Sequence, residues 1–203
     1  MSELIQITID GRTTLVPPEA TILQVATDLG IEIPTLCYHP ALEPYGACRL
    51  CTVEVIRDGW SRLVTACNYP VRQEIEVLTA SDKVVRGRRM IVELLWARCP
   101  EAEIFQALGA RYGIKKPRFE MREGELCYLC GLCVRFCNEV VGAKAISLVS
   151  RGVDREVTEI MHRTHMGTDQ DFRNLIFQGT RCALADGWGG SMLATDLQDV
   201  LFG

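Results

Sequence analysis

The chain has 203 residues, 48% of them hydrophobic, which is enough for one or two domains with buried cores. Its formal net charge of −4 argues against broad electrostatic binding of nucleic acid, because that affinity comes mainly from neutralising phosphates. The sequence has no run of about 18 apolar residues for a membrane span, and its acidic, alternating start, MSELIQITID, lacks the pattern of a signal peptide. We therefore expect a cytoplasmic protein without membrane insertion.

The first 80 residues are predicted to form a small mixed sheet with one helix packed across it. Alternating residues over 4–16, around the tight-turn pair Asp10-Gly11, predict a β-hairpin. Thr21 can cap a helix that ends near Gly30. Further strands are expected at 52–56, 62–66 and 74–78.

Residues 81–116 are predicted to be a helical linker. Behind Ser81, which can cap a helix, apolar residues repeat at helical spacing, and a second helix is expected over 101–112. The basic sequence RGRR at 86–89 is interpreted as the solvated face of the first of these helices.

The chain contains ten cysteines, and their grouping into C-x2-C units indicates metal binding rather than disulfides. Cys48 and Cys51 can bind iron from a single loop, while two more distant cysteines complete a set of four ligands. Small residues at Gly46 and Ala47 would let backbone N–H groups approach the sulfurs. The pattern favours a [2Fe–2S] cluster, and a zinc site is the alternative. The proposed ligands are Cys37, Cys48, Cys51 and Cys67.

A second cysteine run, CYLCGLCVRFC, occupies residues 127–137. In ferredoxins with this spacing, the first three cysteines bind one [4Fe–4S] cluster and the fourth binds a neighbouring cluster. A second such run should therefore follow, but the sequence has none. We predict a partial [4Fe–4S] ferredoxin-type domain over 117–157, and the spacing does not decide which residue is the fourth ligand of its cluster. The candidate ligands are Cys127, Cys130, Cys133 and Cys137.

The segment PTLCYHPALEPYGACRLCTVEV, followed by TACNYPV, resembles a known family. It is similar to the ferredoxin-type β-grasp domain of complex I peripheral-arm subunits and of NAD-linked hydrogenase and formate dehydrogenase subunits. The similarity covers about residues 1–98, and CVRFCNEVVGAKAISLVSRGVDREV resembles the same subunits. By this resemblance the first four cysteines ligate a [2Fe–2S] cluster.

The chain departs from this family directly after the first domain. Many such subunits carry a His-x3-Cys-x2-Cys-x5-Cys cluster site there, whereas this chain has ARCPEAEIFQALGARYGI, with Cys99 alone. That intermediate cluster is expected to be absent. Cys99 is interpreted as a packing residue or a free thiol, with ligation as the minor alternative.

Residues 158–203 resemble a different family. The words HRTHMG, ALADGWGGSM and LQDVLFG are similar to an internal segment of the catalytic subunit of nickel-containing anaerobic CO dehydrogenase. In that family the catalytic metal ligands lie outside this segment, so none is carried over. We expect a helical tail in which Cys182 is a buried small residue, or alternatively a substitute cluster ligand. The abrupt junction near residues 156–160 suggests a gene fusion or deletion, or an assembly error.

The predicted fold is therefore α+β. It comprises a β-grasp ferredoxin-type domain (1–80), a helical linker (81–116), a partial [4Fe–4S] ferredoxin-like domain (117–157) and a helical tail (158–203). No arrangement of side chains suggests a nucleophile or a general base.

The leading function is an electron-transfer module of a larger oxidoreductase. Its expected partners are a flavin/NAD-binding subunit and a catalytic oxidoreductase subunit. The alternatives are a catalytically incomplete fragment or fusion associated with CO dehydrogenase, and a zinc-binding scaffold protein.

Overall fold

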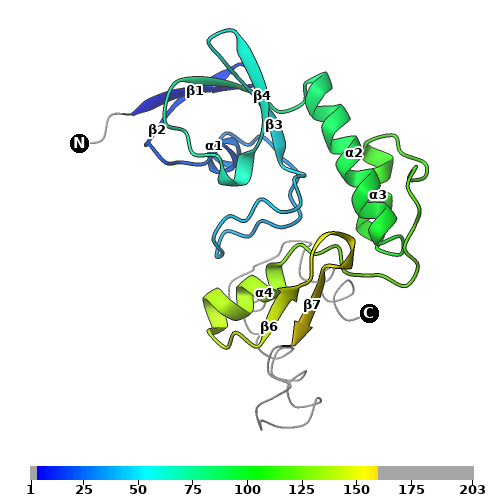
Figure 1. Cartoon of the computed structure of the whole chain (residues 1–203). Coiled ribbons are helices and arrows are strands. Elements are labelled where there is room, and N and C mark those ends of the chain that lie inside the picture. Colours follow the sequence, from blue (N-terminus) through cyan, green and yellow to red (C-terminus); the bar gives the residue numbers. More distant parts are fainter. Residues whose placement is uncertain (1–3, 160–203) are drawn as a thin grey trace. The chain divides into compact units, whose positions relative to one another are not determined.

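The computed structural model describes residues 4–159, which are coloured by sequence position in Figure 1. The chain forms two compact units, with the boundary between Cys130 and Gly131. The described residues contain both strands and helices, which confirms the α+β class. The helical tail expected over 158–203, with Cys182, lies outside the described residues except for residues 158 and 159.

The first unit is built on a five-stranded mixed sheet with strand order β2-β1-β5-β3-β4. The predicted N-terminal hairpin is confirmed as the antiparallel pair β1 (Ile5–Ile9) and β2 (Arg12–Val16). Strand β5 (Ile75–Leu78) pairs parallel to β1 and antiparallel to β3 (Thr52–Arg57). Strand β4 (Trp60–Thr65) closes the other edge and leads into a short 3-10 turn, η1 (Ala66–Asn68).

Helix α1 (Ile22–Asp28) packs against one face of this sheet and forms the main core with it. It starts at a capping box, in which the Thr21 hydroxyl accepts from the Gln24 N–H and the Gln24 side chain accepts from the Thr21 N–H. Because alternate strand residues point to the same face, the sheet meets the helix with a continuous apolar layer. Its fully buried members include Ile7, Ile9, Ile22, Val53, Val55 and Val77.

The linker folds as helix α2 (Asp82–Arg98) followed by helix α3 (Glu103–Arg111). Ser81 caps α2, as predicted, by accepting the Val84 N–H. Gly109 allows the two helices to approach closely, because a Cβ there would lie 2.4 Å from the ring of Trp96.

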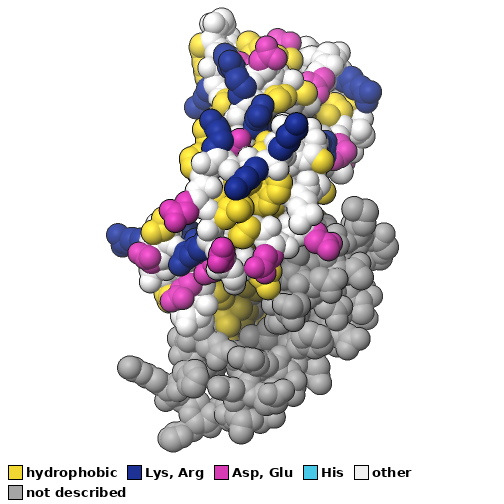
Figure 2. All heavy atoms as spheres, turned by 90° about the vertical axis from the view of Figure 1, so that its right-hand side faces the viewer, with side chains coloured by type: hydrophobic (Ala, Val, Ile, Leu, Met, Phe, Trp, Pro, Cys, Tyr) yellow, Lys and Arg dark blue, Asp and Glu magenta, His cyan; other side chains and the backbone are white. Residues whose placement is uncertain are grey.

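The interpretation of RGRR as a fully solvated face was wrong for one residue. Arg88 is buried, and its Nε and Nη2 donate to the carbonyl oxygen of Thr52 at 3.0 and 2.7 Å. A guanidinium can satisfy a strand-end carbonyl in this way, which ties α2 to β3. Its neighbours Arg86 and Arg89 are exposed, and Figure 2 shows basic side chains lying among hydrophobic ones on this side of the molecule.

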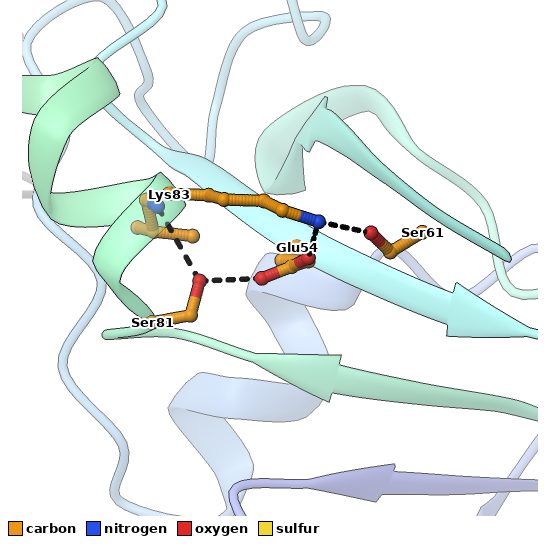
Figure 3. Close-up of polar contacts among 5 residues, drawn as sticks. Glu54, Ser61, Ser81 and Lys83 are labelled. Atoms are coloured by element: carbon orange, nitrogen blue, oxygen red, sulfur yellow. Dashed lines mark hydrogen bonds and ion pairs between the residues drawn. The ribbon is translucent and has the colours of Figure 1, made fainter.

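A carboxylate on β3 ties the sheet to the start of α2 (Figure 3). The buried Glu54 accepts from Ser81 Oγ at 2.5 Å and from Lys83 Nζ at 2.8 Å. Lys83 also donates to Ser61 Oγ on β4 at 2.6 Å. The hydrogen bond from Lys83, followed by those of Ser81 and Ser61, lowers the pKa of Glu54 to about 2.

We expect Glu54→Gln to lower the free energy of unfolding at pH 7 by about 1–3 kcal/mol, since charge-assisted hydrogen bonds are lost. A carboxyl group whose pKa is lowered by folding stabilises the fold at pH values above its unfolded pKa of 4.5. This stabilisation disappears as the pH falls towards the folded pKa of about 2. The difference between wild type and variant should therefore shrink over this window. Urea unfolding at pH 7 and pH 3 measures it, with Glu76→Gln on the exposed face of β5 as the control. A difference that is independent of pH would contradict this assignment.

The second unit, as far as it is described, is a small helix and hairpin. Helix α4 (Leu132–Phe136) runs into a π-helical turn, η2 (Cys137–Val141). Strands β6 (Ile146–Val149) and β7 (Glu156–Glu159) pair antiparallel across a 3-10 turn, η3 (Gly152–Asp154). Its core contains Val134, Cys137, Ala145 and Ile146. Within residues 4–159, no helix has the length and hydrophobicity needed to cross a membrane.

Candidate metal centres

The four cysteines of the first domain come from three separate parts of the fold. Cys37 lies in the long segment between α1 and β3, Cys48 and Cys51 lie where that segment enters β3, and Cys67 lies in η1 after β4. All four are at most 7% exposed. The pairing of β3 with β4 joins the last two segments, since the Ala66 N–H donates to the Cys51 carbonyl at 3.0 Å.

Cys37 and Cys48 form one pair of thiols. The backbone N–H of Cys48 donates to Cys37 Sγ at 3.3 Å, and the two side chains are also hydrogen bonded to each other. This side-chain hydrogen bond, followed by burial, raises the pKa of the Cys48 thiol.

Cys51 and Cys67 form a second pair. The side-chain hydrogen bond between them lowers the pKa of Cys51 to about 7 and raises that of Cys67. Backbone N–H groups of Ala66 and Cys67 also favour the Cys51 thiolate. The sulfur of Cys51 is therefore prepared to carry negative charge.

The two pairs interact electrostatically, since the charges of Cys37 and Cys48 both raise the pKa of Cys67. A [2Fe–2S] cluster takes four thiolates over two irons, so two neighbouring pairs of thiols fit it. Among the described residues, no three His, Cys, Asp or Glu side chains converge on the position of a single metal ion. None of the nine cysteines in this part of the chain is in a disulfide.

Backbone N–H groups point at three of these sulfurs. Cys48 N–H donates to Cys37 Sγ, Leu36 and Leu50 donate to Cys48, and Ala66 and Cys67 donate to Cys51. The Cys48 N–H comes directly after Gly46 and Ala47, the small residues at which the sequence predicted an approach of the backbone to the sulfurs.

Gly46 has a different role, which is to let two cysteine-bearing segments approach each other. Its φ of +69° is in the left-handed region, and a Cβ there would lie 2.7 Å from Asn68 Nδ2. Asn68 follows Cys67 and is held by a 2.5 Å hydrogen bond between its Oδ1 and Thr65 Oγ1. A side chain at position 46 would therefore push the Cys48 loop away from the Cys67 turn.

We expect Gly46→Ala to weaken iron retention, because the left-handed conformation alone costs about 1–2 kcal/mol for an alanine and the contact with Asn68 adds to it. Iron loss to a chelator, followed by absorbance, should be about tenfold faster, which corresponds to roughly 1.4 kcal/mol. Gly59→Ala is the matched control, since its φ is +78° but nothing lies within 4 Å of the new Cβ. Equal iron loss in the two variants would contradict the role of the Asn68 contact.

The second cysteine run is divided between the two units. Cys127 and Cys130 end the first unit, and Cys133 and Cys137 belong to α4 and η2 of the second. Cys137 lies in the core of the second unit, where its Sγ accepts the Ala145 N–H at 3.3 Å.

Tyr128 is a candidate site residue that was not predicted from the sequence. Its ring packs edge-on against Phe105, with centroids 5.5 Å apart, and its hydroxyl is hydrogen bonded to the Cys130 side chain. Burial first, and then the charge of Cys130, raises the pKa of Tyr128, and the charge of Cys48 acts in the same direction. Tyr128 is therefore near both cysteine groups of the first unit. The position of Tyr128 between Cys127 and Cys130 was the sequence feature that could have indicated it.

Comparison with known proteins assigns both ends of the chain. Residues 2–82 match the family described as 2Fe-2S iron-sulfur cluster binding domain. This segment is a 2Fe-2S domain. Residues 118–203 match the Prismane/CO dehydrogenase family. That match begins upstream of residue 158, where the resemblance was expected to start, and it includes the second cysteine run.

The 2Fe-2S domain is shared with subunits of several oxidoreductases. The chain is 39% identical over 173 residues to NADPH-Fe(3+) oxidoreductase subunit alpha of Geobacter sulfurreducens, covering 73% of this chain and 20% of that protein. It is 35% identical to NADP-reducing hydrogenase subunit HndD of Solidesulfovibrio fructosivorans, covering 73% and 30%. It is 33% identical to an NADH-quinone oxidoreductase subunit of Rhizobium meliloti, covering 76% and 21%. The chain thus spans less than a third of these relatives.

A solved structure is also similar to this chain. It is a chain from the crystal structure of NAD+-reducing [NiFe]-hydrogenase in the H2-reduced state, with a TM-score of 0.67 and 27% identity. The similarity covers 80% of each chain. It therefore extends beyond the 2Fe-2S domain into the linker and the region of the second cysteine run.

Proposed function

We propose that the chain is an iron–sulfur electron-transfer module of a multisubunit oxidoreductase. The observation that carries this proposal is the presence of two buried thiol pairs inside the matched 2Fe-2S domain. Cys37 and Cys48 would hold one iron, and Cys51 and Cys67 the other. When bound, such a cluster accepts and donates single electrons.

The protein's own contribution is to exclude water and to stabilise negative charge on the sulfurs. Backbone N–H groups point at Cys37, Cys48 and Cys51 from the surrounding turns. Such donors favour the more negative, electron-rich state and so raise the reduction potential. The β-grasp arrangement, with α1 across the sheet, holds the turns that carry these donors.

We further propose that the second cysteine run holds a [4Fe–4S] cluster, to which electrons pass from the first site. The spacing of Cys127, Cys130 and Cys133 supports it, and Cys137 is the remaining cysteine of the run. Tyr128 supports a relay, since it is near Cys48 of the first group and Cys130 of the second.

The partners would be a flavin/NAD-binding subunit on one side and a catalytic oxidoreductase subunit on the other. The relatives support such an assembly, because they are subunits of an NADPH-Fe(3+) oxidoreductase, an NADP-reducing hydrogenase and an NADH-quinone oxidoreductase.

Metal analysis tests the proposal against the zinc alternative. We expect the full chain, purified without oxygen, to be brown, to contain iron with acid-labile sulfide, and to bleach on addition of dithionite. A colourless protein that contains zinc and no iron would contradict the proposal.

The match of residues 118–203 to the Prismane/CO dehydrogenase family favours a second candidate, a catalytically incomplete CO dehydrogenase fragment or fusion. CO-dependent viologen reduction by the purified chain, with nickel and iron supplied, tests whether the chain has CO dehydrogenase activity. We expect no sustained turnover, and sustained turnover would contradict both the electron-transfer proposal and the incomplete fragment.

A further inference from the structure

Arg88 is a buried arginine on helix α2 whose charge has no opposite charge beside it within residues 4–159. The residue is 5% exposed, and none of the ion pairs in this part of the chain includes it. A guanidinium keeps its proton in proteins, so Arg88 is positively charged. Because a buried charge is costly unless it is compensated, the position of this one needs a reason.

The buried carboxylates of the first unit are already paired with other cations. Glu54 accepts from Lys83 Nζ at 2.8 Å, and Glu93 accepts from Nε and Nη2 of Arg118 at 2.7 and 2.5 Å. Each of these carboxylates is thus neutralised by a residue other than Arg88. The compensation for Arg88 has to come from another group.

The hydrogen bonds of Arg88 lead to the loop that carries two of the proposed cluster ligands. Its Nε and Nη2 both donate to the carbonyl oxygen of Thr52, the residue directly after Cys51. The N–H and the hydroxyl of Thr52 donate in turn to the Arg49 carbonyl, at 3.2 and 2.5 Å. These bonds close the turn between Cys48 and Cys51. The guanidinium is therefore fixed to the residue next to Cys51, in a buried place.

A cluster at this site would supply the opposite charge. Four thiolates give a [2Fe–2S] cluster a net negative charge, which grows by one unit when the cluster takes up an electron. A positive charge nearby stabilises the more negative state and so raises the reduction potential. This effect persists for a buried charge, since water and salt screen it only weakly.

We infer that Arg88 is a positioning residue whose charge, held beside Cys51 through Thr52, raises the reduction potential of the [2Fe–2S] cluster. The inference rests on the proposed function, since it names a residue that tunes the cluster proposed there. Reduction adds one electron, from the donor subunit of the proposed assembly, to the cluster. Arg88 neither gains nor loses a proton in this step.

The test is a redox titration of the full chain, reconstituted with iron and sulfide and followed by the [2Fe–2S] EPR signal. It compares wild type, Arg88→Gln and Arg88→Lys at the solution potential that reduces half of the wild-type clusters. We expect the ratio of reduced to oxidised cluster to be about tenfold lower in Arg88→Gln, a shift of about 59 mV for a one-electron couple. Arg88→Lys keeps the charge and should stay close to wild type.

Arg86→Gln is the matched control. It removes the same charge from the same helix, but Arg86 is exposed, so water and salt screen its effect and the ratio should stay at the wild-type value. A shift in Arg86→Gln as large as that in Arg88→Gln would overturn the inference.

The two substitutions of Arg88 separate charge from hydrogen bonding, because glutamine can still donate to the Thr52 carbonyl but is neutral. A wild-type ratio in Arg88→Gln, or equal shifts in Arg88→Gln and Arg88→Lys, would overturn the inference and leave the proposed function standing. If Arg88→Gln binds no iron, Arg88→Lys decides, and a tenfold lower ratio there would overturn the inference. Absence of the [2Fe–2S] signal from wild type would contradict the proposed function itself.

Discussion

Replacing Cys51 with alanine is expected to abolish the [2Fe–2S] cluster. Cys51 is the thiol whose pKa is lowered to about 7, by Cys67 first, and whose sulfur receives backbone N–H groups from Ala66 and Cys67. Alanine removes the sulfur and leaves one iron with a single protein ligand. The EPR signal of the [2Fe–2S] cluster and the iron bound at this site should fall to background, more than about tenfold below wild type.

Cys137→Ala is the matched control for this variant. Cys137 is also buried, but it belongs to the core of the second unit. Its loss should leave the [2Fe–2S] absorbance and EPR signal unchanged. If Cys51→Ala kept its cluster while Cys137→Ala lost it, the ligand assignment would be wrong.

Phe105→Ala should have the largest effect on the stability of the helical linker. Phe105 is completely buried, and its ring is the platform for Tyr128. Truncating a buried phenylalanine costs about 3–5 kcal/mol, because transfer energy is lost and a cavity remains. Urea unfolding monitored by circular dichroism measures the loss.

Gln106→Ala, an exposed position on the same helix, should change stability by less than about 0.5 kcal/mol. Phe105→Leu should fall between the two, since it keeps most of the apolar volume. A Phe105→Ala variant as stable as Gln106→Ala would mean that α3 contributes little to the unit.

Local sequence patterns predicted the hairpin and the helix starts of the first domain and the linker. Alternating residues indicated the hairpin, Thr21 indicated the start of α1, and Ser81 indicated the start of α2, because each of these signals acts over a few residues. The same is true of the cysteine spacing that indicated a [2Fe–2S] site, and residues 2–82 are such a domain.

Features that depend on distant contacts could not be predicted. Arg88 is buried because its hydrogen bonds go to Thr52, a residue 36 positions earlier. Cys99 looked isolated in the sequence, yet its neighbour Arg98 donates to the carbonyl oxygen of Cys127, a residue 29 positions later. Neither relation leaves a periodic pattern, so tertiary structure was needed to find them.

The second cysteine run lies in a region that is similar both to the Prismane/CO dehydrogenase family and to a hydrogenase chain. The Prismane/CO dehydrogenase match begins at residue 118, whereas the solved hydrogenase chain covers 80% of this chain. Similarity alone therefore does not assign the run to one lineage. Whether the run holds a cluster depends on iron binding by its own cysteines.

EPR spectroscopy of the full chain, loaded with iron and sulfide and reduced by dithionite, tests the central claim most directly. We expect the signal of a reduced [2Fe–2S] cluster, integrating to about one spin per chain, that is lost in Cys51→Ala and kept in Cys137→Ala. Iron-free protein without such a signal, with zinc bound by the same four thiols, would contradict it.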